Sequence, residues 1–316
     1  MDAAAYHIPV LAPASLEGLG VGSKQGGVFV DATFGGGGHT RLMLDALNAD
    51  GHIYGMDQDS DVRENVPQDQ RFTLLPENFR YMRNFLRQEG VRYVDGILAD
   101  LGVSSHQFDT GSRGFSIRFE GPLDMRMNQS QPISAAAVVG SYTVAELTRV
   151  FRQYGELKPP DKAAYAIESA RKDAPITRTS ELIAALSTLA PRGKENQYFA
   201  QVFQALRIEV NDELGALQAM LLSSIELLQE GGRLAIISYH SLEDRMVKHF
   251  MRSGNFDDKI PRDLKGKALC PFILLSRKAI IADSDEQESN PRARSARLRI
   301  AERTALTSEQ IKQATA

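Results

Sequence analysis

Short apolar runs alternate with amphipathic segments along the first hundred residues of the chain. Each run closes on a polar residue or a turn, as the buried strands of a parallel sheet do. A helix through Leu19, with Pro9 near its start, precedes the first run. The pattern predicts an α/β fold. The expected strands are Val28–Asp31, Ile53–Asp57, Phe72–Leu75 and Val94–Asp100, and the expected helices between them are Thr40–Asn48, Ser60–Asn65 and Phe79–Gln88.

The alternation stops after the fourth expected strand. Residues 101–131 are rich in Gly, Ser, Arg and Met, and a stretch this long without periodicity is typical of a functional loop. We expect residues 108–211 to form an inserted all-helical domain that recognises the substrate, and residues 1–107 and 212–316 to form the sheet-containing domain. Helical spacing without an intervening strand covers Thr143–Gln153, Lys162–Lys172, Thr179–Leu189 and Gln197–Val210.

The strand pattern returns in the last hundred residues. Leu214–Leu228 has helical spacing, and Glu230–Gly232 predicts a sharp turn before a strand at Arg233–Ser238. His240–Met251 is a further expected helix. The remaining expectations are two antiparallel strands, Pro271–Ala279 and Ala296–Ile300, and a mobile acidic connector, Asp283–Ser289.

Four consecutive glycines, Gly35–Gly38, follow the first expected strand, so a ligand could lie against the main chain at the carboxyl end of the sheet. Asp57 ends the second strand and could accept hydrogen bonds from ribose hydroxyls. A dinucleotide fingerprint is incomplete, because Thr40 or Arg41 stands where its third glycine belongs. Asp31, directly before the turn, would repel a pyrophosphate and suits the cationic S-adenosylmethionine. It could also, or instead, hold the turn through backbone N–H groups.

Asp100 ends the fourth expected strand, at the sheet edge where a substrate should meet a cofactor. Its carboxylate could accept a hydrogen bond from an exocyclic amine and aim the nitrogen lone pair at a methyl group. An acid in this position is equally common as a helix cap, so both interpretations stand. Methylation of a pyrimidine carbon requires a thiolate nucleophile, and the single cysteine, Cys270, lies far from this strand. A nitrogen or oxygen acceptor is therefore favoured.

His240, Ser241 and Asp244 are residue types of hydrolase triads and metal sites, but their pattern is a weak signal. A nucleophile elbow is missing, and one His/Asp pair on a helix seldom holds a metal. We interpret Ser241 and Asp244 as a capping pair of the expected helix and predict no metal site.

Charge limits the possible partners. The 316 residues carry a net charge of −3, so nucleic acid would have to bind a local basic patch, such as the C-terminal arginines 292, 294, 297 and 299. The solvated face of a final strand is a slightly better interpretation of these arginines on composition alone. The sequence has no apolar run of membrane length and no signal-peptide pattern, so the cytoplasm is the expected location.

With these residues in hand, the chain closely resembles the bacterial family of small-subunit ribosomal RNA cytosine-N4 methyltransferases, of the ribosomal RNA small subunit methyltransferase H type. The resemblance covers nearly the whole length, and its blocks follow the order of the family. The blocks are His7–Leu11, Asp31–His39, Asp100–Ser105, Arg113–Ser116, Gly121–Met127, Phe203–Ile208, Ser238–Arg245 and Asn290–Ala296.

The resemblance implies a Rossmann-like class I methyltransferase that carries an inserted helical domain. It implies S-adenosylmethionine-dependent N4-methylation of a cytidine in the decoding region of 16S ribosomal RNA, within the small ribosomal subunit, with Asp100 as the catalytic residue. Phe79 would stack on adenine, with a core aromatic as the alternative interpretation. We further expect Arg113, Arg118, Arg126, Arg292 and Arg294 to contact RNA phosphates. The cofactor contacts that the resemblance implies are Gly37, Gly38, His39, Asp57, Phe79, Asp100 and Gln107.

Two departures from the family pattern lie in the expected helical domain. Leu157 stands where the family has a glutamate, and Asn196–Val202 replaces a segment that contains proline. Both bear on RNA contacts and domain docking rather than on cofactor chemistry. The alternatives are an NAD-dependent oxidoreductase and a non-catalytic S-adenosylmethionine-binding RNA scaffold. The sequence does not indicate an oligomeric state, and its modest charge favours a preformed subunit surface over free RNA.

Overall fold

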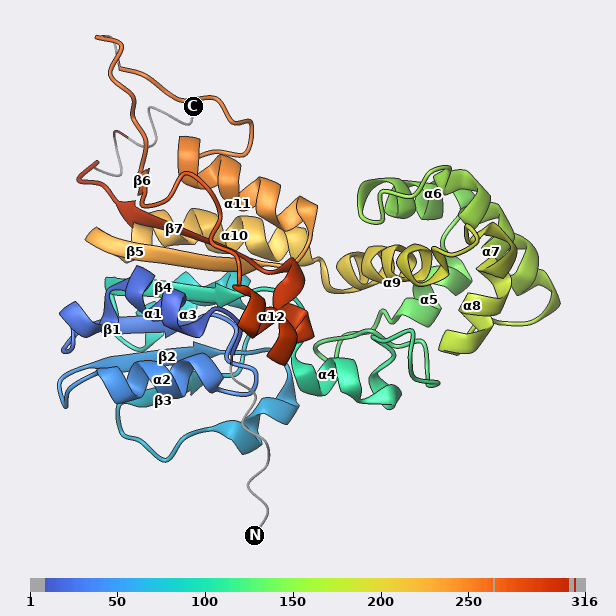
Figure 1. Ribbon diagram of the computed structural model, residues 1–316, viewed down its shortest axis with the longest axis horizontal. Coiled ribbons are helices and arrows are strands. Elements are labelled where there is room, and N and C mark those ends of the chain that lie inside the picture. The colour runs from blue at the N-terminus through green and yellow to red at the C-terminus, as the bar shows by residue number, and fades with distance from the viewer. Residues whose placement is uncertain (1–8, 264, 307–309, 311–316) are drawn as a thin grey trace. The chain divides into compact units, whose positions relative to one another are not determined.

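The computed structural model describes residues 9–263, 265–306 and 310 (Figure 1). His7 and Ile8, which open the first block of the resemblance, lie outside the described residues. The chain forms two compact units. Unit 1 combines Met1–Gly102 with Gly215–Ala316, and unit 2 is Val103–Leu214.

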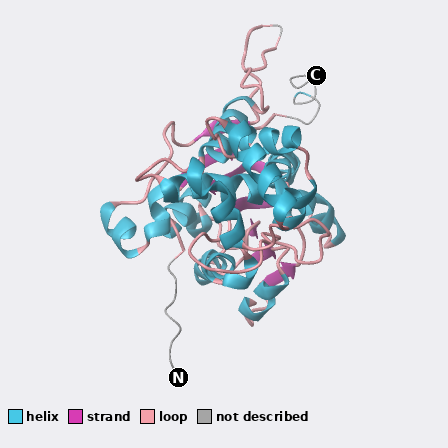
Figure 2. Cartoon of the chain, turned by 90° about the vertical axis from the view of Figure 1, so that its right-hand side faces the viewer, coloured by secondary structure: helices cyan, strands magenta, loops and turns pink. Residues whose placement is uncertain are grey.

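The described strands of unit 1 form one seven-stranded sheet with the order β3-β2-β1-β4-β5-β7-β6. The first five strands run parallel, and β7 is antiparallel to both β5 and β6. Figure 2 marks these strands in magenta among the cyan helices. The strands are β1 (Val28–Asp31), β2 (His52–Met56), β3 (Phe72–Leu75), β4 (Val94–Asp100), β5 (Leu228–Ser238), β6 (Phe272–Leu274) and β7 (Arg297–Arg303).

The predicted parallel strands are confirmed. They are continuous apolar runs because successive side chains point to two faces of the sheet and both faces are buried. Phe29 and Leu98 join the core on one face of the sheet, whereas their neighbours Val30 and Ile97 join the core on the other face. Both faces are therefore buried, which explains the continuous apolar runs. The helices that cover these faces are α1 (Ala12–Leu19), α2 (Gly38–Ala46), α3 (Met82–Gln88), α10 (Glu213–Leu227), α11 (Ser241–Ser253) and α12 (Ser284–Ser289).

The sheet order reverses at β1, which pairs with β2 on one side and with β4 on the other. Ligands of open α/β sheets bind at such a switch point, beyond the carboxyl ends of the strands. Asp31 ends β1, Asp57 follows β2 and Asp100 ends β4, so this edge collects three carboxylates.

Three predictions for the later part of unit 1 are wrong. The turn at Glu230–Gly232 is a bulge inside β5, where Gly231 adopts a φ of 74° and the register with β4 shifts. The helix after β5 is capped by His240 and not by Ser241, because His240 accepts a hydrogen bond from the N–H of Glu243. The acidic connector is the short helix α12, whose first N–H groups are capped by Asp283.

The first helix also differs from its prediction. It begins only at Ala12, and Pro13 rather than Pro9 occupies its first turn. The segments expected as helices at Ser60–Asn65 and Phe79–Tyr81 are 3₁₀ turns, and α3 follows the second of them directly.

The described secondary structure of unit 2 is helical apart from one isolated bridge between Pro122 and Arg178, and the unit has a hydrophobic core of its own. Leu157, one of the departures from the family pattern, is buried in that core, as are Phe199 and Val202 of the second departure. The short helices α4 and α5 were not expected, because neither is long enough to show a helical period. The helices are α4 (Ser105–Asp109), α5 (Ala135–Ser141), α6 (Val144–Gln153), α7 (Pro160–Asp173), α8 (Thr179–Leu186) and α9 (Glu195–Asn211).

Candidate active site

Two features stabilise the glycine turn after β1, namely left-handed backbone conformations and hydrogen bonds from two side chains. Gly35 and Gly37 have φ values of 50° and 72°, which favour glycine. A Cβ atom on Gly36 would meet nothing within 4 Å, so its main chain faces open space. The carbonyl of Gly36 accepts a hydrogen bond from Arg41 (2.6 Å), and that of Gly35 accepts one from Asn65 (3.1 Å). The turn is thus open at Gly36, and contact of a ligand with its main chain stays a prediction.

Asp31 accepts hydrogen bonds from residues on both sides of this turn. Its side chain is buried and accepts hydrogen bonds from the hydroxyl of Thr40 (2.7 Å) and from the N–H of Thr33 (3.2 Å). Burial raises the pKa of the Asp31 carboxyl. Of the two roles considered for Asp31, the structure shows the structural one, and a contact with a cationic ligand stays a prediction.

Asp57 lies between the end of β2 and the glycine turn. Its Oδ2 accepts a hydrogen bond from the N–H of Gly35 (2.9 Å), and its Oδ1 accepts one from the N–H of Asp59 (2.9 Å). Burial raises the pKa of Asp57 to about 6. Because a carboxylate oxygen has two lone pairs, each oxygen can also accept a hydroxyl hydrogen.

Asp100 is held by a side chain that directly follows the neighbouring strand β5. Its Oδ1 accepts a hydrogen bond from the Tyr239 hydroxyl (2.7 Å), and its backbone N–H donates to the hydroxyl of Thr33 (2.6 Å). The side chain remains 24% exposed, and burial raises its pKa to about 6. The helix-cap alternative does not apply, because Ser104 caps the helix that follows.

His39 and Phe79 flank these carboxylates. The buried His39 ring has Nδ1 4.0 Å from Oδ2 of Asp100 and Nε2 3.1 Å from the carbonyl of Val10. Phe79 starts the 3₁₀ turn after β3 and is half-buried, with part of its ring against the core. Its packing supports the core interpretation and leaves an adenine contact as a prediction. Gly37 and Gly38 open α2 directly beside His39.

The predicted site residues of unit 2 have mixed environments. The side chain of Gln107 accepts a hydrogen bond from the N–H of Ser104 in a capping box. Arg113 is buried, and its guanidinium donates to the carbonyls of Arg126 (3.0 Å) and Met127 (3.1 Å), which favours a structural role. Arg126 is paired with the carboxylate of Asp124 (2.7 Å). Arg118 is exposed.

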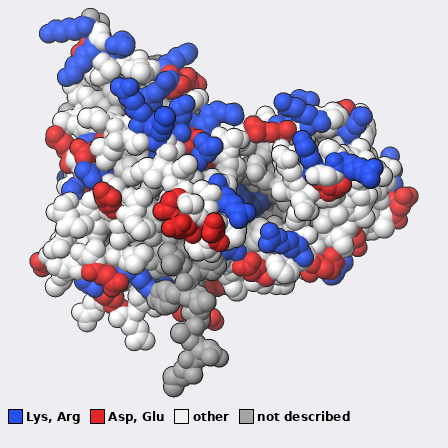
Figure 3. Space-filling model, in the orientation of Figure 1, with Lys and Arg blue, Asp and Glu red and all other residues white. Residues whose placement is uncertain are grey.

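The C-terminal arginines of unit 1 also differ from one another. Arg292 and Arg294 lie on a 3₁₀ turn, and Arg294 is exposed. Arg299 is buried on β7 and donates to both oxygens of Asp244 (2.7 and 3.1 Å). Arg299 is therefore not part of a solvated face. On the face that Figure 3 shows, Lys and Arg also gather at the top of the view, over the segment between α11 and β6.

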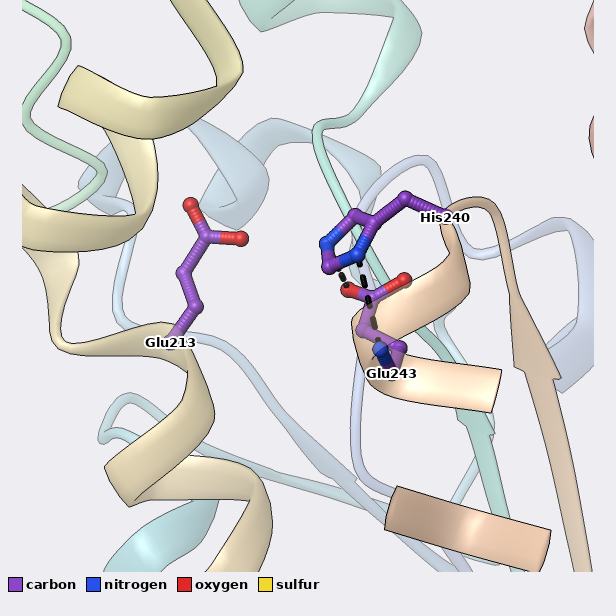
Figure 4. A group of neighbouring side chains, drawn as sticks. All are labelled: Glu213, His240 and Glu243. Atoms are coloured by element: carbon purple, nitrogen blue, oxygen red, sulfur yellow. Dashed lines mark hydrogen bonds and ion pairs between the residues drawn. The ribbon is translucent and has the colours of Figure 1, made fainter. Parts of the chain in front are cut away.

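His240 and Glu243 form a pair at the start of α11 (Figure 4). Nε2 of His240 lies 3.2 Å from Oε1 of Glu243, and Oε2 of Glu243 accepts a hydrogen bond from the N–H of Tyr239. Asp244, the expected capping partner, binds Arg299 instead. The pair therefore fixes the backbone that joins β5 to α11.

Sequence reasoning missed Tyr239 and Thr33 as partners of Asp100. Tyr239 was visible inside the Ser238–Arg245 block, directly after a predicted strand. Its contact depends on β5 lying beside β4, with Ile237 opposite Asp100, a register that no local pattern gives.

Comparison with known proteins identifies the family. A family model described as the MraW methylase family matches residues 4–304. The chain belongs to the MraW methylase family. The ribosomal RNA small subunit methyltransferase H of Parabacteroides distasonis is 50% identical over 299 residues, which cover 94% of this chain and 97% of that protein. The protein of the same name from Cytophaga hutchinsonii is 52% identical over 300 residues, with coverages of 94% and 99%.

A solved structure of an rRNA methylase from Streptococcus thermophilus is also similar to this MraW family chain. The two are 12% identical with a TM-score of 0.39, and the match covers 92% of this chain and 96% of that one. Family membership and the sheet topology together confirm the predicted fold, a Rossmann-like class I methyltransferase with a helical insertion. The protein is a methyltransferase. Within the described residues, none of the helices is both long and apolar enough to span a bilayer.

Proposed function

We propose that this methylase transfers a methyl group from S-adenosylmethionine to the exocyclic N4 of a cytidine in the decoding region of 16S ribosomal RNA. The observation that carries the proposal is the placement of Asp57 and Asp100 on either side of the glycine turn, at the switch point of the sheet. The names of the relatives, ribosomal RNA small subunit methyltransferase H, support the class of substrate.

The residues around the turn fit S-adenosylmethionine. Gly36 leaves room for close approach to the main chain, and the Asp57 carboxylate can accept ribose hydroxyls. Phe79 would lie against the adenine, and Gly37, Gly38, His39 and Gln107 would complete the cofactor contacts. The carboxyl groups of Asp31 and Asp100 end neighbouring strands, and their ionised forms would favour a ligand with cationic groups.

Asp100 would position the acceptor amine. When bound, the cofactor supplies an electrophilic methyl group on a sulfonium. Oδ2 of Asp100 would accept a hydrogen bond from the N4 amine, which draws the nitrogen lone pair out of ring conjugation and toward the methyl carbon. The N–C bond would form as the C–S bond breaks, the bonding pair would stay on sulfur, and N4 would then lose one proton to solvent. An ionised Asp100 favours this geometry, because protonation would turn one of the two acceptor oxygens into an O–H donor.

Unit 2 is proposed to recognise the RNA. The exposed Arg118 and Arg294 are the best placed of the predicted arginines to reach phosphates, since Arg113 and Arg126 already bind partners within unit 2. Arg292 is half-buried beside Tyr239 and remains a candidate. We further propose that the substrate is the assembled small subunit and that the enzyme works in the cytoplasm.

The test is methylation of naked 16S RNA and of assembled small subunits, side by side, with labelled S-adenosylmethionine. Mapping should place the label on N4 of one cytidine of the decoding region, with faster transfer to assembled subunits. Label on a carbon or a ribose oxygen would overturn the proposed acceptor. Absence of transfer, together with stabilisation by S-adenosylhomocysteine in a thermal-shift assay, would favour the scaffold, and stabilisation by NAD alone would favour an oxidoreductase.

A further inference from the structure

We infer that Tyr239 is a positioning residue for the methyl transfer, which acts by fixing the Asp100 carboxylate through a hydrogen bond. The inference rests on the proposed function of Asp100. The Tyr239 hydroxyl lies 2.7 Å from Oδ1 of Asp100, on the other side of the carboxyl group from His39. Oδ2 accepts no hydrogen bond from the described residues, so it is the oxygen that could accept one from an incoming amine.

Tyr239 is itself fixed at both ends. It follows β5 directly, and the register that places Ile237 opposite Asp100 brings the tyrosine beside the carboxylate. Its N–H donates to Oε2 of the buried Glu243 (3.1 Å), which ties it to the first turn of α11. A Cβ on Gly102 would lie 3.6 Å from the Tyr239 ring, so the ring also packs closely against the chain after β4.

The surroundings of Asp100 explain why such a bond matters. Asp31 on β1 and Glu243 on α11 disfavour the ionised carboxylate, whereas His39 on α2 and the Tyr239 hydroxyl favour it. Tyr239 stays a donor at neutral pH, because burial and the adjacent carboxylate raise its pKa, an effect that Arg292 only partly offsets. The tyrosine therefore stabilises ionised Asp100 without adding a charge.

The test is the variant Tyr239→Phe, which removes the hydroxyl and keeps the ring. We expect kcat/KM for methyl transfer to fall about tenfold or more, in line with loss of one hydrogen bond to an ionised group. Affinity for S-adenosylhomocysteine should change less than about twofold. The acidic limb of the kcat/KM profile should move to higher pH, because the bond to the ionised form is lost.

Tyr54→Phe is the matched control, since Tyr54 lies on β2 of the same sheet and its hydroxyl forms no hydrogen bond with the described residues. It should leave both rate and profile unchanged. Titration of Asp100 by carbon-13 NMR reads the same pKa without catalysis, so it separates this inference from the proposed function. A Tyr239→Phe variant that retains its fold but shows an unchanged Asp100 titration would overturn the inference, even if RNA methylation is confirmed.

Discussion

Asp57 follows β2 and Asp100 ends β4, the strands on opposite sides of β1, and burial raises the pKa of each acid to about 6. Their partners differ. Both oxygens of Asp57 accept main-chain N–H groups, so this carboxylate is part of the loop structure. Asp100 is oriented through a side chain, Tyr239, and its other oxygen, Oδ2, accepts no hydrogen bond from the described residues. We infer from this difference that main-chain bonds suit a binding role, whereas a carboxylate set by a side chain suits chemistry.

Removal of Asp100 should have the largest effect on activity. Asp100→Ala is expected to keep the fold and to lower the rate of methyl transfer by about 10²-fold or more, because the amine loses its orienting acceptor. Single-turnover transfer from labelled cofactor measures the rate. Asp95→Ala, at the other end of the same strand, is the control and should retain activity. Activity of Asp100→Ala at the wild-type level would remove Asp100 from the mechanism.

Asp57→Ala should instead act on cofactor binding. Each lost hydrogen bond to an ionised group is worth roughly 1.5–3 kcal/mol, so affinity for S-adenosylhomocysteine should fall about 10- to 100-fold by calorimetry. Some unfolding free energy should be lost as well, because the N–H groups of Gly35 and Asp59 lose their acceptor. Asp57→Asn keeps one acceptor oxygen, so its affinity for S-adenosylhomocysteine should lie between those of the wild type and Asp57→Ala. An unchanged affinity in both variants would contradict the ribose assignment.

The placement of these two acids at one edge of the sheet could be predicted, because each stands at the end of an apolar run and parallel strands bring their carboxyl ends together. Their partners could not. The Tyr239 contact joins residues 139 positions apart and depends on strand register. The same limit applies to Gly231, which looks like a turn but is a bulge, since only pairing with β4 keeps the chain in the sheet. Likewise, His240 rather than Ser241 caps α11, because cap choice depends on local backbone angles.

A rise in pH should lower the contribution of Asp100 to the stability of the protein and raise the activity, because both depend on the ionisation of Asp100. A carboxyl whose pKa is raised in the folded state binds its proton more tightly there than in the unfolded chain, so its contribution to stability falls between about pH 4 and pH 6 and is constant above. A folded-state pKa that lies one pH unit above the unfolded-state pKa lowers the free energy of unfolding by about 1.4 kcal/mol. Activity should change in the opposite direction and rise as Asp100 ionises near pH 6.

The variant Asp100→Asn isolates this effect. At pH 4 it should have nearly the unfolding free energy of the wild type, and at pH 7 it should be relatively more stable, because it has no carboxyl to ionise in a buried site. Urea unfolding at the two pH values measures the difference. A gap that does not grow with pH would show that Asp100 ionises as easily in the folded protein as in the unfolded chain.

The smallest expected effects concern the arginines. Some of them are hydrogen-bonded within the protein, whereas others are exposed and could contact RNA. Arg118→Ala or Arg294→Ala should each reduce the slope of log affinity against log salt by about 0.7 for one phosphate contact with single-stranded RNA, and leave stability unchanged. Arg113→Ala should instead destabilise unit 2 by about 1–3 kcal/mol, because the carbonyls of Arg126 and Met127 lose a buried donor. Filter binding at several salt concentrations, with thermal unfolding in parallel, distinguishes the two outcomes. A reduced salt slope for a fully folded Arg113→Ala variant would mean that the buried Arg113 also contacts a phosphate. Bonding to partners within the protein would then not separate structural arginines from RNA-binding ones.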